Sequence, residues 1–143
     1  MNVRRNTRVA VVTGGGGGIG SAVAIELARQ GATVVVMDPG VGVEGEPLNE
    51  PTAAETAKRI EVQGGTAVAS TVSVTDRESL QGLLEQTASD FGSLDIVVNT
   101  AGILRFSSFV ETVESDWTDV LDVHLNGYLN VLSSALPIMV DSG

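Results

Sequence analysis

The chain has 143 residues, enough for one compact domain, and the 3% aromatic content means that its core is built from Val, Ala, Leu and Ile. A formal net charge of −10 makes nucleic acids and anionic membranes poor partners, so we expect neither. The absence of cysteine excludes disulfides, thiol catalysis and Cys-ligated zinc and fits a reducing cytoplasm, and no apolar run approaches a membrane span in length.

Strand patterns and amphipathic helix patterns alternate along the chain. We expect a buried strand at 8–13, further strands at 33–37, 66–70 and 94–98, and helices at 18–30, 52–63, 77–91 (capped by Asp76) and 112–140. Strand–helix units in series indicate parallel strands joined by right-handed crossovers, so the predicted fold class is α/β. In such sheets ligands bind beyond the carboxyl ends of the strands, where we expect the chemistry to lie.

The stretch Thr13–Gly20 (TGGGGGIG) connects the first strand to the first helix and holds six glycines in eight residues. A helix N-terminus exposes unpaired N–H groups that bind a diphosphate when no side chain holds it away. Gly14 permits the tight turn out of the strand, Gly18 lets phosphates approach the backbone, and Gly20 allows close packing. The lysine-bearing phosphate loop is excluded because no Gly-Lys-Ser/Thr follows.

Asp38 ends the second strand and supplies the acidic residue that a dinucleotide site needs after its glycine turn. Its carboxylate can accept hydrogen bonds from both ribose hydroxyls and would repel a 2′-phosphate. No Arg or Lys stands in the glycine stretch or beside Asp38, so we predict NAD rather than NADP as the cofactor. The alternative is an ordinary solvated loop acid.

The segment 39–51 has no periodicity and contains several Gly and Pro residues and three acidic residues. It is predicted to be an exposed loop, longer than most connections in a compact domain. Two interpretations are open: a surface insertion, and a flap near the bound ligand.

Three motifs occur in order on the expected elements: Thr-Gly-x-x-x-Gly-x-Gly at 13–20, Asn-Thr-Ala-Gly at 99–102, and the helical stretch at 117–127. Together they resemble the short-chain dehydrogenase/reductase family. The resemblance implies a Rossmann-type doubly wound parallel sheet with strand order 3-2-1-4. It also implies a cofactor site formed by Gly14, Gly18, Ile19 and Gly20 at the pyrophosphate and nicotinamide-side ribose, Ser73 and Val74 at adenine, and Asn99, Ala101 and Gly102 beneath the cofactor.

The sequence departs from the family pattern at three positions. Ser73 stands where the family has Asp or Asn, and Thr100 replaces the second Asn of its Asn-Asn-Ala-Gly element. His124 occupies the position of an Asn that helps to hold a proton-relay water at a local helix irregularity. His124 could act through its backbone carbonyl or shuttle protons with its ring, or be a hydrogen-bonded core residue. We expect it to face inward with Trp117, Leu121, Tyr128 and Leu132.

The family's catalytic set is a Ser, a Tyr and a Lys four residues after the Tyr. A phenol has an unperturbed pKa near 10, and a neighbouring ammonium lowers it. The only tyrosine is Tyr128, which is followed four residues later by Leu132 and lies inside a predicted helix. We therefore expect residues 1–143 to form a single dinucleotide-binding domain, ending before the family's fifth strand and inactive alone.

Strand 94–98 would be an open edge in this strand order, so we expect the natural chain to continue or a partner to cover it. In the family the long helix lies in subunit interfaces, and we expect a homo-oligomer through 112–140.

The sequence favours an NAD-dependent oxidoreductase that transfers a hydride between a nicotinamide and a small-molecule secondary alcohol or ketone. No metal is expected, because no cluster resembles a metal site. Leu104, Arg105 and Phe106 either edge the substrate pocket or lie on a surface loop. The alternatives are a non-catalytic nucleotide-binding or scaffolding module and an inert chain without cofactor affinity.

Overall fold

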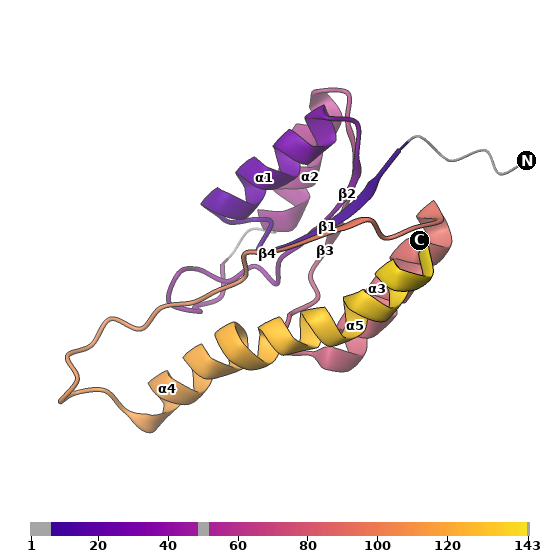
Figure 1. The fold of residues 1–143 in the computed structure, drawn as a ribbon. Helices are drawn as coiled ribbons and strands as arrows, with labels where there is room; N and C mark the ends of the chain where they lie inside the picture. The colour runs from indigo at the N-terminus through magenta and orange to yellow at the C-terminus, as the bar shows by residue number, and fades with distance from the viewer. Residues whose placement is uncertain (1–6, 49–51, 143) are drawn as a thin grey trace, which may run out of the picture.

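The computed structural model describes residues 7–48 and 52–142, which form a parallel sheet with helices on both faces (Figure 1). The sheet has four strands in the order β3-β2-β1-β4, and each neighbouring pair is parallel. The strands are β1 (Val9–Thr13), β2 (Thr33–Met37), β3 (Thr66–Ser70) and β4 (Ile96–Asn99). This arrangement confirms the predicted α/β, Rossmann-type sheet and its strand order.

Helices α1 and α2 lie on one face of the sheet, and α3 and α5 lie on the other (Figure 1). The helical elements are α1 (Gly18–Arg29), α2 (Thr52–Val62), α3 (Arg77–Phe91), α4 (Glu114–Leu121), the π-helical turn η1 (Asp122–Asn126) and α5 (Gly127–Ser142). The first three match their predicted ranges to within one residue.

The two central strands are buried along their whole length because helices cover both of their faces. Val12 packs in one core layer with Ile60 of α2, and Val11 packs in the opposite layer with Leu84 of α3. Burial of one such side chain contributes about 1.5–3 kcal/mol relative to exposure, so the strands are fixed from both sides. Their carboxyl ends are thereby held in one row.

A capping side chain begins α3, and glycines with positive φ end α1 and α3. The Asp76 carboxylate accepts a hydrogen bond from the backbone N–H of Ser79 at 3.1 Å, which caps α3. Gly92 follows that helix in the left-handed region, at φ +87°, and Gly31 follows α1 at φ +89°. These are the positions where a residue without Cβ ends a helix at least cost.

The fourth strand begins two residues later than predicted, at Ile96, and ends one residue later, at Asn99. The predicted range was wrong at its start because Asp95 uses its side chain on the neighbouring strand. The Val9 N–H donates to Asp95 Oδ2 at 2.7 Å, so a carboxylate replaces a backbone carbonyl there. Leu94 is nevertheless buried.

The predicted single helix over 112–140 is divided into α4, η1 and α5. The Gly127 N–H donates to the Asp122 carbonyl, five residues earlier, and His124 lies inside this wider turn. The helix irregularity that the family resemblance implied is therefore present at His124.

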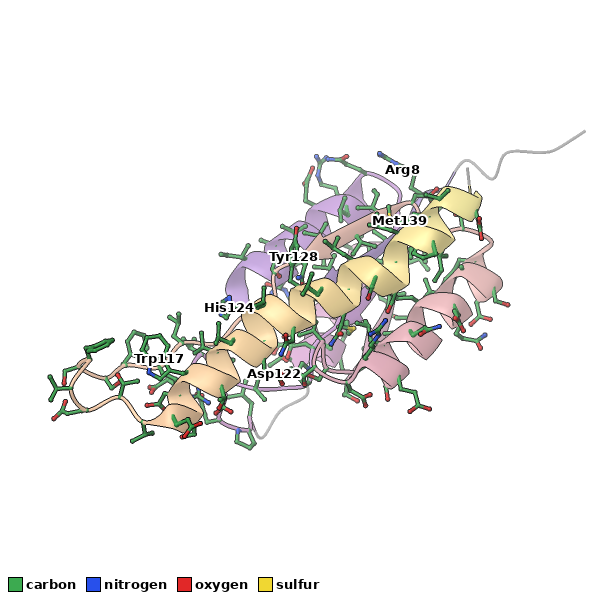
Figure 2. All side chains as sticks on the ribbon, turned by 60° about the horizontal axis from the view of Figure 1, so that its bottom comes forward. Arg8, Trp117, Asp122, His124, Tyr128 and Met139 are labelled. Atoms are coloured by element: carbon green, nitrogen blue, oxygen red, sulfur yellow. The ribbon has the colours of Figure 1, made fainter. Side chains whose placement is uncertain are left out.

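The expected inward orientation of the stripe around His124 was wrong. Trp117, Leu121 and Tyr128 are 51%, 51% and 47% exposed, and His124 is exposed as well. Figure 2 shows Trp117, His124 and Tyr128 one after another along this run of helix. The helix turns its small residues inward instead: a Cβ at Gly127 would lie 2.6 Å from the side chain of Val74.

Strand β4 pairs with β1, and the described residues provide no partner strand on its other side. A groove of about 350 Å³ separates this edge from α5. It is lined by Val97, Val98, Asn99, Tyr128, Val131, Leu132, Ala135, Leu136 and Met139. The edge is therefore apolar and open among the residues described.

Candidate cofactor site

A cavity of about 430 Å³ lies at the carboxyl ends of the strands. It brings together six of the predicted site residues: Gly14, Asp38, Ser73, Val74, Ala101 and Gly102. Gly18, Ile19, Gly20, Asn99 and His124 are not part of its lining. The cavity is also walled by Met37, Pro39, Val41, Gly42, Val43, Gly45, Thr75, Thr100, Ile103, Arg105, Asp119, Asp122 and Val123, with Gly17 beside Gly14.

The glycine turn has no room for side chains at several positions, Gly14 and Gly20 among them. Gly14 has φ +64°, and a Cβ there would lie 2.8 Å from the backbone nitrogen of Ala101. A Cβ at Gly20 would lie 2.1 Å from the carbonyl oxygen of Gly14. The turn, the first turn of α1 and the loop after β4 therefore touch through their backbones.

The N-terminus of α1 is open at the positions expected to meet a diphosphate. A Cβ at Gly18 would have no neighbour within 4 Å, and Ile19 is 75% exposed. The N-cap, Gly17, has no side chain, so none caps the first N–H groups of α1. Those groups and the positive end of the helix dipole suit an anionic ligand.

Asp38 is only 7% exposed, which does not fit a solvated loop acid. Its Oδ2 accepts a hydrogen bond from the Gly16 N–H at 3.0 Å, and its Oδ1 accepts one from the Gly40 N–H at 2.8 Å. A carboxylate has about four acceptor positions, so both oxygens keep capacity for further donors. The side chain thus joins the glycine turn to the start of the 39–48 segment within the cavity wall.

Thr13 organises the backbone beneath the cavity, a role that the sequence analysis missed. Its hydroxyl donates to Asn99 Oδ1 and accepts the Ala101 N–H at 3.2 Å. Its carbonyl accepts the Thr100 hydroxyl at 2.6 Å. Asn99 therefore bonds across the strand ends rather than into the cavity. The signal was present in the sequence, because both threonines stand where neighbouring parallel strands end.

Ser73 and Val74 form the wall that follows β3. The Ser73 hydroxyl lies 2.8 Å from that of Thr75 and accepts the Thr75 N–H at 3.2 Å, so it stabilises its own turn. Val74 is buried, and its carbonyl accepts a hydrogen bond from Asn130 Nδ2 at 3.0 Å. Asn130 of α5, which sequence reasoning also missed, fixes this wall from behind.

His124 holds the loop that follows β4. Its Nε2 lies 3.1 Å from the backbone nitrogen of Ile103 and 2.8 Å from the carbonyl oxygen of the same residue. The ring also covers Gly102, where a Cβ would lie 2.7 Å from His124 Cε1. The imidazole is thus engaged with backbone rather than directed into the cofactor cavity.

A second hollow, of about 450 Å³, adjoins the cofactor cavity and shares Ile103 and Arg105 with it. Its other lining residues are Leu104, Ser107, Phe109, Thr112, Asp116, Trp117, Val120 and His124. Phe109 and Trp117 meet edge to face with ring centroids 6.0 Å apart. The hollow is mainly apolar, and Leu104 and Arg105 line it as the sequence suggested, whereas Phe106 does not.

The described residues hold no group of three or more His, Cys, Asp or Glu side chains that could bind a metal ion. Tyr128 lies on α5, against the edge of β4, and not at the cavity. The arrangement that these residues do form is a trough with a bare helix N-terminus at one end, a buried carboxylate in one wall and backbone as its floor. Such a trough can bind a dinucleotide.

Comparison with known proteins assigns the chain to a family. The family model for short chain dehydrogenases matches residues 8–143. This chain belongs to the short-chain dehydrogenase family. The family is one of oxidoreductases, and its match begins at β1 and includes all three motifs noted in the sequence.

Individual members of the family are similar over most of this chain. Peroxisomal multifunctional enzyme A of Dictyostelium discoideum is 45% identical over 128 residues, which cover 89% of this chain and 28% of that protein. A short chain dehydrogenase from Mycobacterium avium is 40% identical with a TM-score of 0.80, over 92% of this chain and 46% of that one. Carveol dehydrogenase from the same organism, solved with NAD, is 26% identical with a TM-score of 0.85, over 96% and 51%. The chain thus spans about half of the length of these relatives, or less.

Proposed function

We propose that this chain is the cofactor-binding part of an NAD-dependent oxidoreductase that transfers a hydride between a nicotinamide and a secondary alcohol or ketone. The observation that carries the proposal is the hydrogen bond of Asp38 to Gly16, which brings a buried carboxylate and a bare helix N-terminus into one trough. Family membership and the NAD-bound relative support the same reading.

The residues fit a dinucleotide in an extended pose. The diphosphate would lie at the N-terminus of α1, over Gly18 and Ile19, where Gly18 has no side chain and open space around it. Adenine would lie against Ser73 and Val74, and the nicotinamide end over Ala101. The nicotinamide supplies or accepts the hydride, and the chain's own part is to bind and orient it.

Charge favours NAD over NADP. Asp38 would accept bonds from the adenosine ribose hydroxyls and repel a 2′-phosphate. Among the described residues that line the cavity, Arg105 is the one basic side chain. Its guanidinium already pairs with Asp119 at 2.7 Å and Asp116 at 3.6 Å, so it offers little charge to a 2′-phosphate.

We propose a positioning role for His124 rather than proton transfer by its ring. Nε2 is engaged by the backbone of Ile103, and the ring covers Gly102. The π-helical turn around it, rather than the imidazole, is the feature suited to hold a water near the nicotinamide end.

A non-catalytic nucleotide-binding module is the second candidate. It is favoured by Tyr128, the one tyrosine of the sequence, which lies against β4 and is followed four residues later by Leu132. We propose that the 143-residue chain has no turnover of its own, because the acid–base set of the family is not among its residues.

The deciding experiment is a fluorescence titration of the chain with NADH and with NADPH, beside an assay of alcohol oxidation. We expect saturable NADH binding, weaker NADPH binding and no oxidation. Gly18→Asp is the matched variant. It adds a negative charge at the open helix N-terminus, which would repel the diphosphate, so it should abolish NADH binding without unfolding the chain. Tighter binding of NADPH than of NADH would contradict the assignment of Asp38.

We propose a homo-oligomer formed through α4, η1 and α5. These elements expose an apolar stripe consisting of Trp117, Leu121, Leu125, Tyr128, Leu129, Leu136 and Val140. Such a continuous apolar face suits a second copy of the same surface. Analytical ultracentrifugation of wild type beside Leu125→Glu tests this, and a wild type that sediments as a monomer at every concentration would contradict it.

We also propose the reducing cytoplasm as the compartment, on the ground that the sequence holds no cysteine. Among the residues described, no helix has both the length and the apolar character to cross a bilayer. The Dictyostelium relative carries "peroxisomal" in its name, so the peroxisome is the rival. Microscopy of the tagged natural protein in its own cells distinguishes the two.

A further inference from the structure

Residues 49–51 of the predicted loop lie outside the described part of the chain, and the described part, 39–48, is held together by its own hydrogen bonds. Val41 and Pro47 form an antiparallel bridge, the Gly42 N–H donates to the Glu46 carbonyl at 2.8 Å, and the Leu48 N–H donates to the Gly40 carbonyl at 2.8 Å. The segment 39–48 thus has the form of a small hairpin. Its residues supply one wall of the cofactor cavity, which agrees with the flap interpretation of this segment.

This hairpin is fastened to the loop after β4. The Leu104 N–H donates to the Val43 carbonyl at 2.7 Å, and Arg105 Nη1 donates to the Glu44 carbonyl, 61 residues earlier in the chain. A Cβ at Gly45 would lie 3.1 Å from Arg105 Nη1, so the hairpin and the guanidinium are in close contact. Two segments distant in the sequence are therefore joined across the trough.

The same guanidinium is anchored to α4. Arg105 Nη2 lies 2.7 Å from Asp119 Oδ2, and Nε lies 3.6 Å from Asp116 Oδ1. The Arg105 side chain is only 22% exposed, so these contacts are partly shielded from solvent. One planar fork thus connects the hairpin, the loop after β4 and α4, a geometry that the single ammonium of lysine cannot reproduce.

We propose that Arg105 is a positioning residue that fastens the segment 39–48 over the cofactor cavity and thereby slows the release of the cofactor. The inference rests on the proposed function, because it assumes that NADH occupies this cavity. Asp119 and Asp116 fix the guanidinium on one side, and the Glu44 carbonyl ties the hairpin to the other. Without Arg105 the hairpin keeps the bond from the Leu104 N–H to the Val43 carbonyl as its described link to the loop after β4, and it opens more often.

Stopped-flow measurement of NADH association and release tests the proposal. Arg105→Met keeps the apolar stem and removes the fork; we expect release about five- to tenfold faster, with a nearly unchanged association rate. Arg105→Lys should lie between Met and wild type. Arg59→Met is the control, because it removes one positive charge from the exposed face of α2, and it should release NADH as the wild type does.

Cleavage by a glutamate-specific protease at Glu44 gives a second measurement, in which the two proteins are first compared without cofactor. We expect faster cleavage in Arg105→Met than in wild type, with unchanged melting temperature, and slower cleavage of wild type when NADH is present. Equal NADH release by wild type and Arg105→Met would overturn this inference alone. An absence of NADH affinity in the wild type would overturn the proposed function and the cofactor role of Arg105 together.

Discussion

The carboxylate of Asp38 lies 3.0 Å from the backbone nitrogen of Gly16. The acidic residue at the end of β2 therefore supports the glycine turn after β1 while it lines the cavity. A variant at Asp38 consequently changes two things, the shape of the turn and the charge of the wall. Paired substitutions can separate them.

Asp38→Asn and Asp38→Ala should differ in their effect on NADH binding. Both remove the charge, and loss of one or two hydrogen bonds to a charged acceptor should weaken binding by about 1–3 kcal/mol. Asn keeps one acceptor for Gly16 or Gly40, so Ala should be the weaker binder. Titration with NADPH should show a smaller preference for NADH in both variants. An NADH affinity equal to that of wild type would contradict the role.

Gly20→Ala and Gly82→Ala should change stability in opposite directions. The added methyl at Gly20 would meet the Gly14 carbonyl at 2.1 Å, so the turn has to move and the fold is destabilised. At Gly82, on α3, a Cβ meets nothing within 4 Å, and alanine should stabilise the helix by about 0.5–1 kcal/mol. Urea denaturation followed by circular dichroism measures both, and a stable Gly20→Ala would refute the tight contact.

His124→Ala should loosen the loop after β4. The ring bonds the backbone of Ile103, and its loss should lower the free energy of local opening by about 1 kcal/mol. Hydrogen exchange at the Ile103 N–H is the measurement. His124→Asn, whose amide carries both a donor and an acceptor, is the matched control and should retain more protection. Identical exchange in all three proteins would exclude the positioning role.

Asp76 should make the stability of the fold depend on pH in the acidic range. Hydrogen bonds from the Ser79 hydroxyl, and then from the Ser79 N–H, lower the pKa of Asp76 below its usual 3.8. Because the pKa is lower in the folded state, the cap stabilises the protein above pH 3.8, and this contribution is lost as the pH falls through the folded-state pKa.

This effect is measured by urea denaturation of wild type and Asp76→Asn, which gives the free energy of unfolding of each protein. The pH is lowered from neutral to 2.5 or below in steps of about half a pH unit. Asn also caps helices but does not titrate, so the difference between the two proteins should shrink as the pH falls. A difference that is constant over the whole range would show that Asp76 does not titrate with folding.

Local patterns determined most of the fold that could be predicted. Strands 33–37 and 66–70 match β2 and β3 residue for residue, because each is a short run of strand-favouring residues that follows a glycine at the end of a helix. The π-helical turn was not predictable from its residues, because the sequence DVHLN is equally compatible with an ordinary α-helix. The helix orientation was mistaken because Gly127 packs on Val74, a contact between distant segments.

Some residues of the candidate site were predictable from their neighbours in sequence, and others were not. Gly14 and Asp38 were predictable, because Gly14 stands at a tight turn and Asp38 at the end of a strand, and both line the cavity. Thr13, Asn130 and Arg105 were harder to assign, because each acts through a partner that is remote in sequence. Asn130 bonds the Val74 carbonyl, 56 residues away, and nothing near Asn130 indicates that partner.

The position of β1 has a consequence for biosynthesis. Of the four described strands, β1 is synthesised first, and it lies in the middle of the sheet, between β2 and β4. It can pair with β2 early, but the hydrogen-bond acceptor of its Val9 N–H is Asp95, which is synthesised 86 residues later. At about 5–20 residues per second, that side of the nascent strand stays unpaired for several seconds.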